Sequence, residues 1–499
     1  MDLAANFSRL LETGDTQHAI EYRGKWYTWE ILGRIAQDVT RQIKAAGVPK
    51  DAAAGFIIRN RPEHIAGLLL LLASKRCASM ISPLSAPARI IEQMRSSNLR
   101  LYLASSSTWE QSGVLDAARK LGAAAISISD DGDRVDILAH YSPSAGAGRT
   151  VAPDCAAELL TSGTTGSPKR VPVSRDTLNS MAIEMQAMLT AMGDRVDEAE
   201  HTPHLVFQPL STIGGLVYSL PSLATGRQIV LQEKFELAVW REAMSRHRIK
   251  LAGLSPAVMR MVVDGGVTPT ELASVKAVRC GNAALDSSLR ETFERIYGIP
   301  ILTLYGASEF CGPVCAWTLD LYHQYAAEKS GSVGRPLPNV DLRVVDADTN
   351  SPLAPGVVGL LEVKAKRMGT HWQCTNDLAS IDKDGFLFLH GRADSAINRG
   401  GFKVLPQEVA AVINQHPAVA TATVIGLPDR RLGEVPAAAI ELKPDMDSVT
   451  PEDIELFLRD KLLAYQIPKQ IVIVDALPRN HMLKVSQHEL PALFKLKDE

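Results

Sequence analysis

The feature that most constrains the fold is a regular alternation of short apolar runs with helix-like stretches between Ala53 and Tyr305. The apolar runs are rich in β-forming residues, and in the segments between them apolar positions recur every three or four residues. This alternation predicts an α/β fold with parallel sheets. The predicted strands are 55–58, 99–104, 123–127, 206–207, 229–231, 251–254 and 301–305, and the predicted helices include 62–74, 237–246 and 287–297.

The pattern changes twice along the chain. A loop rich in Gly and Pro at 142–154 suggests a joint between two lobes, and short alternating runs at 331–389 predict a small antiparallel β module. After Gly391 a helix and two strand-like runs indicate a compact α+β domain. We therefore expect a large N-terminal domain, 1–393, divided at roughly 150 and 330, and a small C-terminal domain, 394–499.

Charge and cysteine usage restrict the class of protein. The 53 Lys and Arg against 56 Asp and Glu give a formal charge of -3, so there is no basic excess for nucleic acid. The six scattered cysteines are expected to be reduced thiols. The first residues do not resemble a signal peptide, and the apolar run at 66–73 is too short to span a membrane. A cytoplasmic location is expected.

The segment 159–172, LLTSGTTGSPKRVP, carries the strongest chemical signal. An apolar run leads into a loop of glycines and hydroxyl residues that Lys169 closes. Such a loop suits polyphosphate, because glycines let backbone N–H groups approach the ligand and a lysine adds a positive charge. The glycine spacing and Arg170 after Lys169 exclude a Walker A loop. Taken alone, the segment could also be a flexible surface turn.

The same segment resembles the signature loop of the adenylate-forming superfamily of acyl-CoA synthetases, nonribosomal peptide adenylation domains and luciferases. Other blocks similar to that family follow in order: 207–216 (FQPLSTIGGL), 277–285 (AVRCGNAAL), 305–309 (YGASE), 331–336 (GSVGRP), 375–377 (TND), 391–394 (GRAD), 424–434 (VIGLPDRRLGE) and 477–484 (LPRNHMLK). The resemblance covers nearly the whole chain and is closest to stand-alone acyl-CoA ligases.

The resemblance implies an enzyme that activates a carboxylic acid with ATP as an acyl adenylate and then transfers the acyl group to coenzyme A. The implied catalytic residues are Lys484, Glu309 and Ser308, with Glu309 also the ligand of Mg²⁺. The implied ATP-binding residues are Thr161, Ser162, Gly163, Thr164, Thr165, Gly166, Lys169, Gly281, Asn282, Ala283, Tyr305, Gly306, Ala307, Asp377 and Arg392.

The resemblance also assigns an acid pocket and a moving C-terminal domain. The pocket residues would be Phe207, Thr212, Ile213, Gly214, Gly281, Gly306, Cys311 and Gly312. Asp394 falls at the family's hinge, about which the domain carrying Lys484 would turn, and the residues that would face coenzyme A are Arg399, Gly400, Gly401 and Phe402.

Three positions depart from the family pattern. Leu483 and Asn376 stand where the family has glycine, and Thr212 stands where many members have histidine. These departures leave open a nucleotide-binding protein with impaired catalysis, although Lys169, Glu309, Asp377, Arg392 and Lys484 match the family.

The sequence restricts the class of carboxylic acid but does not identify the substrate. The pocket motif FQPLSTIGGL contains no carboxylate to pair with an α-ammonium, which disfavours an amino acid and favours an aromatic, alicyclic or fatty acid. Arg279 or Arg260 could instead meet a second carboxylate. The acceptor could also be a carrier-protein phosphopantetheine, and the sequence leaves a homodimer open.

Overall fold

The computed structural model describes residues 1–143, 148–161, 169–193, 202–444, 446, 448–479 and 484–494, with the side chain of Thr161 left out. The chain divides into two compact units. Unit 1 comprises Met1–Gly253, Val267–Lys276 and Gly306–Pro313, and unit 2 comprises Leu254–Gly266, Ala277–Tyr305 and Val314–Glu499. The predicted domain boundary at 393/394 stays a prediction.

The larger sheet of unit 1 has the strand order β7-β6-β5-β3-β4-β8-β9. Its inner strands are parallel, whereas the edge strands β7 and β9 are antiparallel to their neighbours. Every residue of β3, β5 and β6 is buried, which explains why these strands read as continuous apolar runs. The strands are β3 (Ala54–Ile57), β4 (Ala78–Ile81), β5 (Leu101–Ser105), β6 (Ala124–Ile128), β7 (Val135–Ala139), β8 (Cys155–Thr161) and β9 (Lys169–Ser174).

A second sheet of unit 1 has the order β10-β11-β1-β2. The strands β10 (His204–Val206), β11 (Ile229–Leu231) and β1 (His18–Tyr22) are parallel, and β2 (Lys25–Thr28) forms a hairpin with β1. The next strand along the chain, β12 (Leu251–Leu254), was also predicted.

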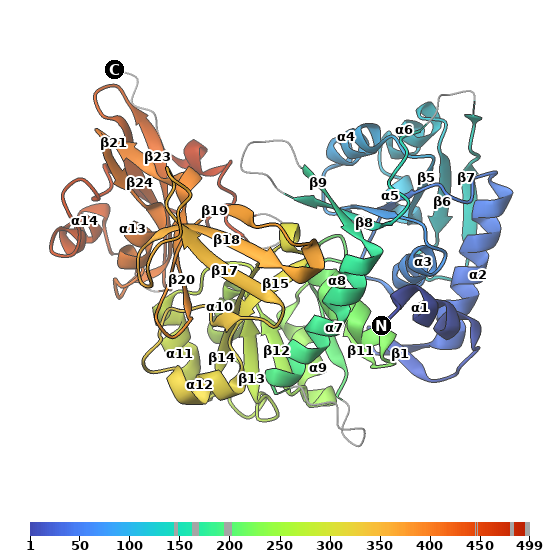
Figure 1. Ribbon diagram of the computed structural model, residues 1–499, viewed down its shortest axis with the longest axis horizontal. Helices are drawn as coiled ribbons and strands as arrows, with labels where there is room; N and C mark the ends of the chain where they lie inside the picture. Colours follow the sequence, from blue (N-terminus) through green and yellow to red (C-terminus); the bar gives the residue numbers. More distant parts are fainter. Residues whose placement is uncertain are drawn as a thin grey trace. The chain divides into compact units, whose positions relative to one another are not determined.

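Helices separate the strands of unit 1, as the alternation predicted (Figure 1). The helix α3 (Pro62–Ala73) starts at a proline and is buried on nearly all sides, so the apolar run at 66–73 is a core helix. Within the described part of the chain, no helix is both long and apolar enough to cross a membrane. The other helices are α1 (Leu3–Glu12), α2 (Trp29–Ala45), α4 (Pro87–Ser97), α5 (Ser106–Trp109), α6 (Val114–Lys120), α7 (Arg175–Ala191), α8 (Ile213–Ala224) and α9 (Leu237–His247).

Unit 2 begins with α/β structure. The strands β13 (Ala277–Cys280) and β14 (Ile301–Ala307) are parallel and are joined by α11 (Ser287–Tyr297), which has the predicted bounds. The strand β15 (Gly312–Ala316) pairs antiparallel with β16 (Arg335–Pro336). The helices α10 (Pro256–Asp264) and α12 (Leu319–Tyr325) complete this part.

Two antiparallel sheets follow in unit 2. The first runs β17 (Val340–Val345), β18 (Gly359–Ala365), β19 (Gln373–Ile381) and β20 (Leu387–Arg392), which confirms the predicted β module. The second has the order β22-β21-β24-β23, with β25 parallel to β24, and its core packs against α13 and α14. Its elements are β21 (Ile397–Arg399), β22 (Phe402–Val404), α13 (Pro406–Ile413), β23 (Val419–Asp429), β24 (Gly433–Leu442), α14 (Pro451–Arg459) and β25 (Gln470–Ile473).

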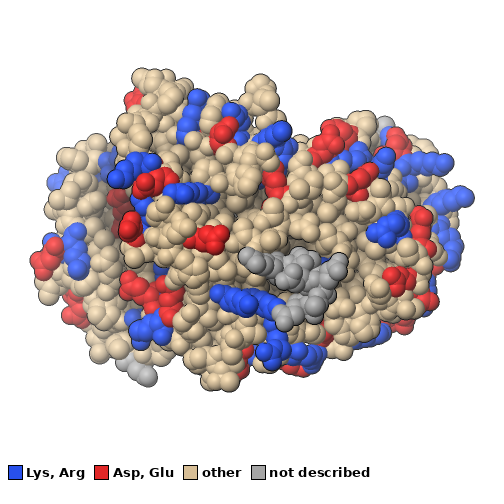
Figure 2. Space-filling model, turned by 60° about the horizontal axis from the view of Figure 1, so that its bottom comes forward, with Lys and Arg blue, Asp and Glu red and all other residues tan. Residues whose placement is uncertain are grey.

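Charged side chains of both signs are interspersed on the surface. On the face shown in Figure 2, Lys and Arg lie close to Asp and Glu in small mixed groups, with other residues between these groups. This distribution accords with the formal charge of -3 and with the absence of a basic excess in the sequence.

Candidate active site

The predicted phosphate loop begins and ends on paired strands of unit 1. Thr161 at the end of β8 and Lys169 at the start of β9 are backbone partners across the ladder. Ser162, Gly163, Thr164, Thr165 and Gly166, which were expected to bind phosphate, lie outside the described residues. The strand β8 is anchored at Glu158, whose two carboxylate oxygens accept from Arg149 at 2.8 and 2.6 Å.

In unit 2 the structure brings together three of the predicted nucleotide-binding residues. Tyr305 near the end of β14 donates from its hydroxyl to the Oδ2 atom of Asp377 at 2.5 Å. Asp377 on β19 lies opposite Arg392 on β20 in the sheet register. Burial, with the adjacent negative charge of Asp377, holds the pKa of Tyr305 well above its usual value, so the phenol stays protonated and acts as a donor.

The aspartate predicted as the hinge follows directly on this cluster. Arg392 donates to both carboxylate oxygens of Asp394 at 2.8 and 2.7 Å, and this contact raises the pKa of Arg392. Asn376 donates from its Nδ2 atom to Asp394 Oδ2 at 3.1 Å. The asparagine that replaces the family's glycine therefore contacts the predicted hinge residue.

The turn after β13 carries the other residues expected near adenine. A Cβ atom on Gly281 would lie 2.6 Å from the Cδ1 atom of Leu304, so a larger residue would require the Leu304 side chain to move. Asn282 has a φ of 72°, in the left-handed region that asparagine tolerates, and Ala283 beside it is exposed. The turn presents its backbone without bulky side chains.

The segment that carries the predicted magnesium ligand belongs to unit 1. Ser308 and Glu309 lie on a 3₁₀ turn, with Ser308 half-buried and Glu309 exposed. The turn ends where the N–H of Cys311 donates to the carbonyl of Ser308 at 3.0 Å. A Cβ atom on Gly306 would lie 2.4 Å from the carbonyl oxygen of Gly312, so only glycine fits there. Ala307 ends β14.

The acid-pocket motif leads from β10 into α8, also in unit 1. Thr212 caps α8: its hydroxyl donates to the carbonyl of Pro209 at 2.8 Å and accepts from the N–H of Gly215 at 3.4 Å. A threonine in place of the family's histidine thus has a clear local role. Ile213 and Gly214 form the first turn of α8 and are half-buried.

Three other pocket residues of unit 1, Phe207, Cys311 and Gly312, are buried. Phe207 packs edge-on against Phe235, with ring centroids 5.3 Å apart. Cys311 is fully buried. A Cβ atom on Gly312 would lie 3.2 Å from Val217 of α8, which places the 306–313 segment against that helix.

Polar residues in and around the acid-pocket segment were not predicted from the sequence. Asn60, which follows β3, makes hydrogen bonds from its side-chain amide to the backbone of Gln208, Leu210 and Gln232. Its distance of 148 residues from Gln208 leaves no local signal in the sequence. The side-chain oxygens of Gln208 and Ser211 are buried and have no hydrogen-bond partner among the described residues.

The C-terminal part of unit 2 holds the predicted lysine. Lys484 is exposed in surface area, but nearby protein desolvates its ammonium and lowers its pKa. An isolated bridge between Arg479 and Val485 brackets the segment. Leu483 lies outside the described residues.

The residues expected to face coenzyme A form the turn between β21 and β22. The guanidinium of Arg399 donates to the carbonyl of Tyr465 at 2.8 Å, so it ties this turn to the chain before β25. Gly400 and Gly401 both have positive φ, at 59° and 93°. Phe402 is 58% exposed and stacks on Tyr465 at 4.8 Å.

Arg260 and Arg279, named as possible partners of a second substrate carboxylate, stay predictions in that role. Arg260 donates to the carbonyl of Ala420 at 3.0 Å and Arg279 is buried within β13. Among the described residues, no group of three or more His, Cys, Asp or Glu side chains gathers as a metal site. A metal at Glu309 would therefore take its remaining ligands from substrate oxygens and water, as Mg²⁺ bound to a nucleotide does.

Comparison with known proteins gives consistent matches along the chain. Residues 9–369 match the family described as AMP-binding enzyme, and residues 408–484 match the AMP-binding enzyme C-terminal domain. The chain is 26% identical to 4-coumarate–CoA ligase 3 of Oryza sativa subsp. japonica, over 97% of this chain and 91% of that protein. It is 28% identical to 2-succinylbenzoate–CoA ligase of Bacillus velezensis, over 96% of this chain and 95% of that protein.

A solved structure supports the same fold. The crystal structure of ATP-bound MatB from Rhodopseudomonas palustris aligns with a TM-score of 0.82 at 22% identity, covering 98% of both chains. The α/β fold with a large N-terminal part and a C-terminal part, predicted from the sequence, is confirmed.

Proposed function

This chain belongs to the AMP-binding enzyme family, and from that premise we propose how its residues divide the work of activating an acid and transferring it to a thiol. The predicted enzyme class, an AMP-forming acid–thiol ligase, is confirmed by the family and its CoA-ligase relatives. The proposal concerns the residue roles, the metal, the class of acid and the acceptor.

In the first step, a carboxylate oxygen attacks the α-phosphorus of ATP and the bond to pyrophosphate breaks. Asp377, oriented by the Tyr305 hydroxyl, accepts from the ribose hydroxyls, and Arg392 adds a positive charge beside it. Lys169 and Lys484 neutralise charge on the phosphates and the attacking carboxylate. The cluster of Tyr305, Asp377 and Arg392 is the single structural observation on which the nucleotide assignment depends.

We assign Mg²⁺ to Glu309, which can hold the ion through its carboxylate. Glu309 is exposed in the middle of a tight turn, and a single carboxylate combined with phosphate oxygens is the usual protein contribution to Mg²⁺ in nucleotide sites. When bound, the ion neutralises charge on the phosphates. Ser308, next to it, offers a hydroxyl donor for the same anionic groups.

In the second step, a thiol sulfur attacks the acyl carbon and AMP leaves. We assign this step to the other face of the C-terminal domain, 394–499, reached by rotation about Asp394. The turn of Arg399, Gly400 and Gly401 supplies an open backbone for the pantetheine arm, with Phe402 exposed beside it. Arg399 shapes this turn through its contact with Tyr465.

The acid is proposed to be an aryl carboxylic acid that carries a hydrogen-bonding substituent. Both named relatives act on aryl acids, 4-coumarate and 2-succinylbenzoate. The acid segment of this chain buries Gln208 and Ser211, whose side-chain oxygens have no partner among the described residues. A buried polar group costs stability unless a partner satisfies it, which favours a polar substituent over a saturated chain.

The acceptor is proposed to be free coenzyme A, in the cytoplasm, where the buried cysteines stay reduced. The second candidate is a carrier-protein phosphopantetheine, because the exposed Phe402 offers an apolar contact that a protein could also use. Thioester formation should be measured with coenzyme A and, separately, with a loaded carrier protein. Transfer only to the carrier would overturn the proposed acceptor, and a preference for decanoate over hydroxycinnamate would overturn the proposed acid.

A further inference from the structure

The tripeptide Arg59-Asn60-Arg61, which is not part of the sequence blocks quoted above, makes hydrogen bonds to the acid-pocket segment and to the chain next to it. It follows β3, precedes α3 and lies wholly within unit 1. The side chain of Asn60 is 3% exposed. Its Nδ2 atom donates to the carbonyls of Gln208 at 2.9 Å and Gln232 at 3.1 Å, and its Oδ1 atom accepts from the N–H of Leu210 at 2.8 Å.

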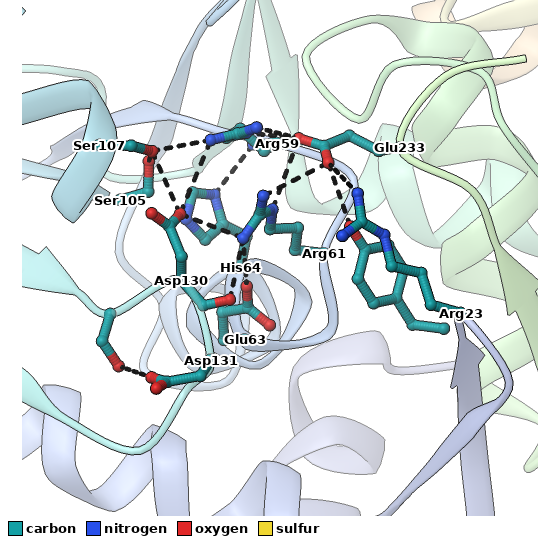
Figure 3. A network of polar contacts seen from close by, with 12 residues as sticks. Arg23, Arg59, Arg61, Glu63, His64, Ser105, Ser107, Asp130, Asp131 and Glu233 are labelled. Atoms are coloured by element: carbon teal, nitrogen blue, oxygen red, sulfur yellow. Dashed lines mark hydrogen bonds and ion pairs between the residues drawn. The ribbon is translucent and has the colours of Figure 1, made fainter.

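The two flanking arginines secure the same neighbourhood through Glu233. Arg59 donates from Nε to Glu233 Oε1 at 2.6 Å, and Arg61 donates to both carboxylate oxygens at 3.4 Å (Figure 3). Tyr22 donates its hydroxyl to Glu233 Oε2 at 3.1 Å. Burial alone would raise the pKa of Glu233, but the charges of Arg59 and Arg61 bring this pKa below its usual value, so the Glu233 carboxylate stays ionised.

Asn60 fixes the backbone on either side of Pro209. The carbonyl of Pro209 accepts from the N–H and the hydroxyl of Thr212, which caps α8. A Cβ atom on Gly215 would lie 2.3 Å from the same carbonyl, so the first turn of α8 packs directly on the backbone bend formed by residues 208–210. The bend is therefore held by Asn60 from one side and by the N-terminus of α8 from the other.

A missing amide at position 60 could not be replaced locally. Leu210 is fully buried and Gln208 and Gln232 are at least nine-tenths buried, so water has little access to the three backbone groups. Each buried backbone group left without a partner costs free energy, and the bend can relieve that cost only by moving.

We propose that Asn60 is a positioning residue for the carboxylic acid: it holds the 208–210 backbone and thereby sets where Phe207, Thr212 and Gly214 meet the substrate. The inference rests on the proposed acid pocket and deepens it. It requires no contact between Asn60 and the acid, because the effect passes through the backbone bend.

The test compares Asn60→Asp and Asn60→Ser in steady-state kinetics of acid-dependent pyrophosphate release, with 4-coumarate as the probe and coenzyme A present. Asp keeps the acceptor and the shape but places an oxygen against the two carbonyls to which Nδ2 donates, whereas Ser keeps one shorter donor. The KM for the acid should rise about 10- to 100-fold in Asn60→Asp and less in Asn60→Ser, with kcat and the KM for ATP within about twofold. The matched control is Asn98→Asp, at an exposed amide that ends α4.

The outcomes separate this inference from the proposed function. If the wild-type protein releases pyrophosphate with no acid in an aryl panel, the proposed substrate class fails before any variant is compared. If the wild type is active but the folded variants lose kcat, or raise both KM values equally, Asn60 has only a general structural role and the inference is overturned. Should Asn60→Asp not fold, as judged by circular dichroism, Asn60→Ser alone decides between these results.

Discussion

Replacing Glu63 by Gln should stabilise the protein at neutral and alkaline pH. Glu63 lies in the first turn of α3, is only 1% exposed and lies near Arg61 (Figure 3). Its nearest cation, the Nη1 atom of Arg61, is 3.8 Å away. Burial raises the pKa of Glu63 to about 7, from about 4.5 in the unfolded chain.

The direction in which the free energy of unfolding changes with pH follows from proton binding at Glu63. Between pH 4.5 and 7 the folded protein binds a proton at Glu63 that the unfolded chain has released, so the free energy of unfolding falls as pH rises. The full shift corresponds to about 3 kcal/mol, of which roughly 2 kcal/mol develops between pH 5.5 and 8.5. Glutamine has the same shape and does not titrate, so in Glu63→Gln position 63 does not lower the free energy of unfolding as pH rises.

The assay is calorimetric unfolding of wild type and Glu63→Gln from pH 5.5 to 8.5. The difference in Tm should grow with pH by about 4 °C, at roughly 2 °C per kcal/mol for a unit of this size. Glu110→Gln, at an exposed carboxylate, serves as the control and should show no such trend. A difference in Tm that is constant with pH, or that shrinks as pH rises, would refute the reasoning.

Three further predictions concern catalysis. Lys484→Ala should abolish adenylation while thioester formation from supplied acyl adenylate continues, and equal loss of both steps would count against the two-face scheme. Tyr305→Phe removes the donor that orients Asp377, so the KM for ATP should rise about tenfold while the KM for the acid stays unchanged; isothermal titration with ATP provides an independent check. Removing Mg²⁺ with EDTA should stop pyrophosphate release, and Glu309→Gln should raise the Mg²⁺ concentration needed for half-maximal rate; an unchanged requirement would argue against Glu309 as the ligand.

Much of the fold could be predicted because buried parallel strands and amphipathic helices leave strong patterns. The predicted helix at 287–297 has those bounds in the structure, and the strand at 229–231 likewise. Strands such as β1 and β2 were not predicted, since their short runs contain polar and aromatic residues, and β1 pairs with β11 far along the chain. The β8–β9 hairpin was also not predicted, because β9 contains Lys169, Arg170 and Pro172 and lacks a continuous apolar run.

The site residues could be predicted only where they belong to sequence motifs that resemble the family. Tyr305, Asp377 and Arg392 were named from the resemblance, and the structure places them together. Asn60 was not predicted, because an asparagine between two arginines matches no motif and its backbone partners lie far away in the sequence. Thr212 was viewed as a loss of histidine, whereas its role as a helix cap becomes evident only from the hydrogen bonds at Pro209 and Gly215.

The central claim is that a carboxylate oxygen of the acid becomes bonded to the α-phosphorus of ATP. The most direct measurement uses an aryl acid labelled with ¹⁸O in its carboxylate, incubated with the wild-type protein, ATP, Mg²⁺ and coenzyme A. Mass spectrometry of the AMP should show one ¹⁸O atom transferred for each acyl-CoA formed. Unlabelled AMP, or label appearing in inorganic phosphate, would contradict the acyl-adenylate route.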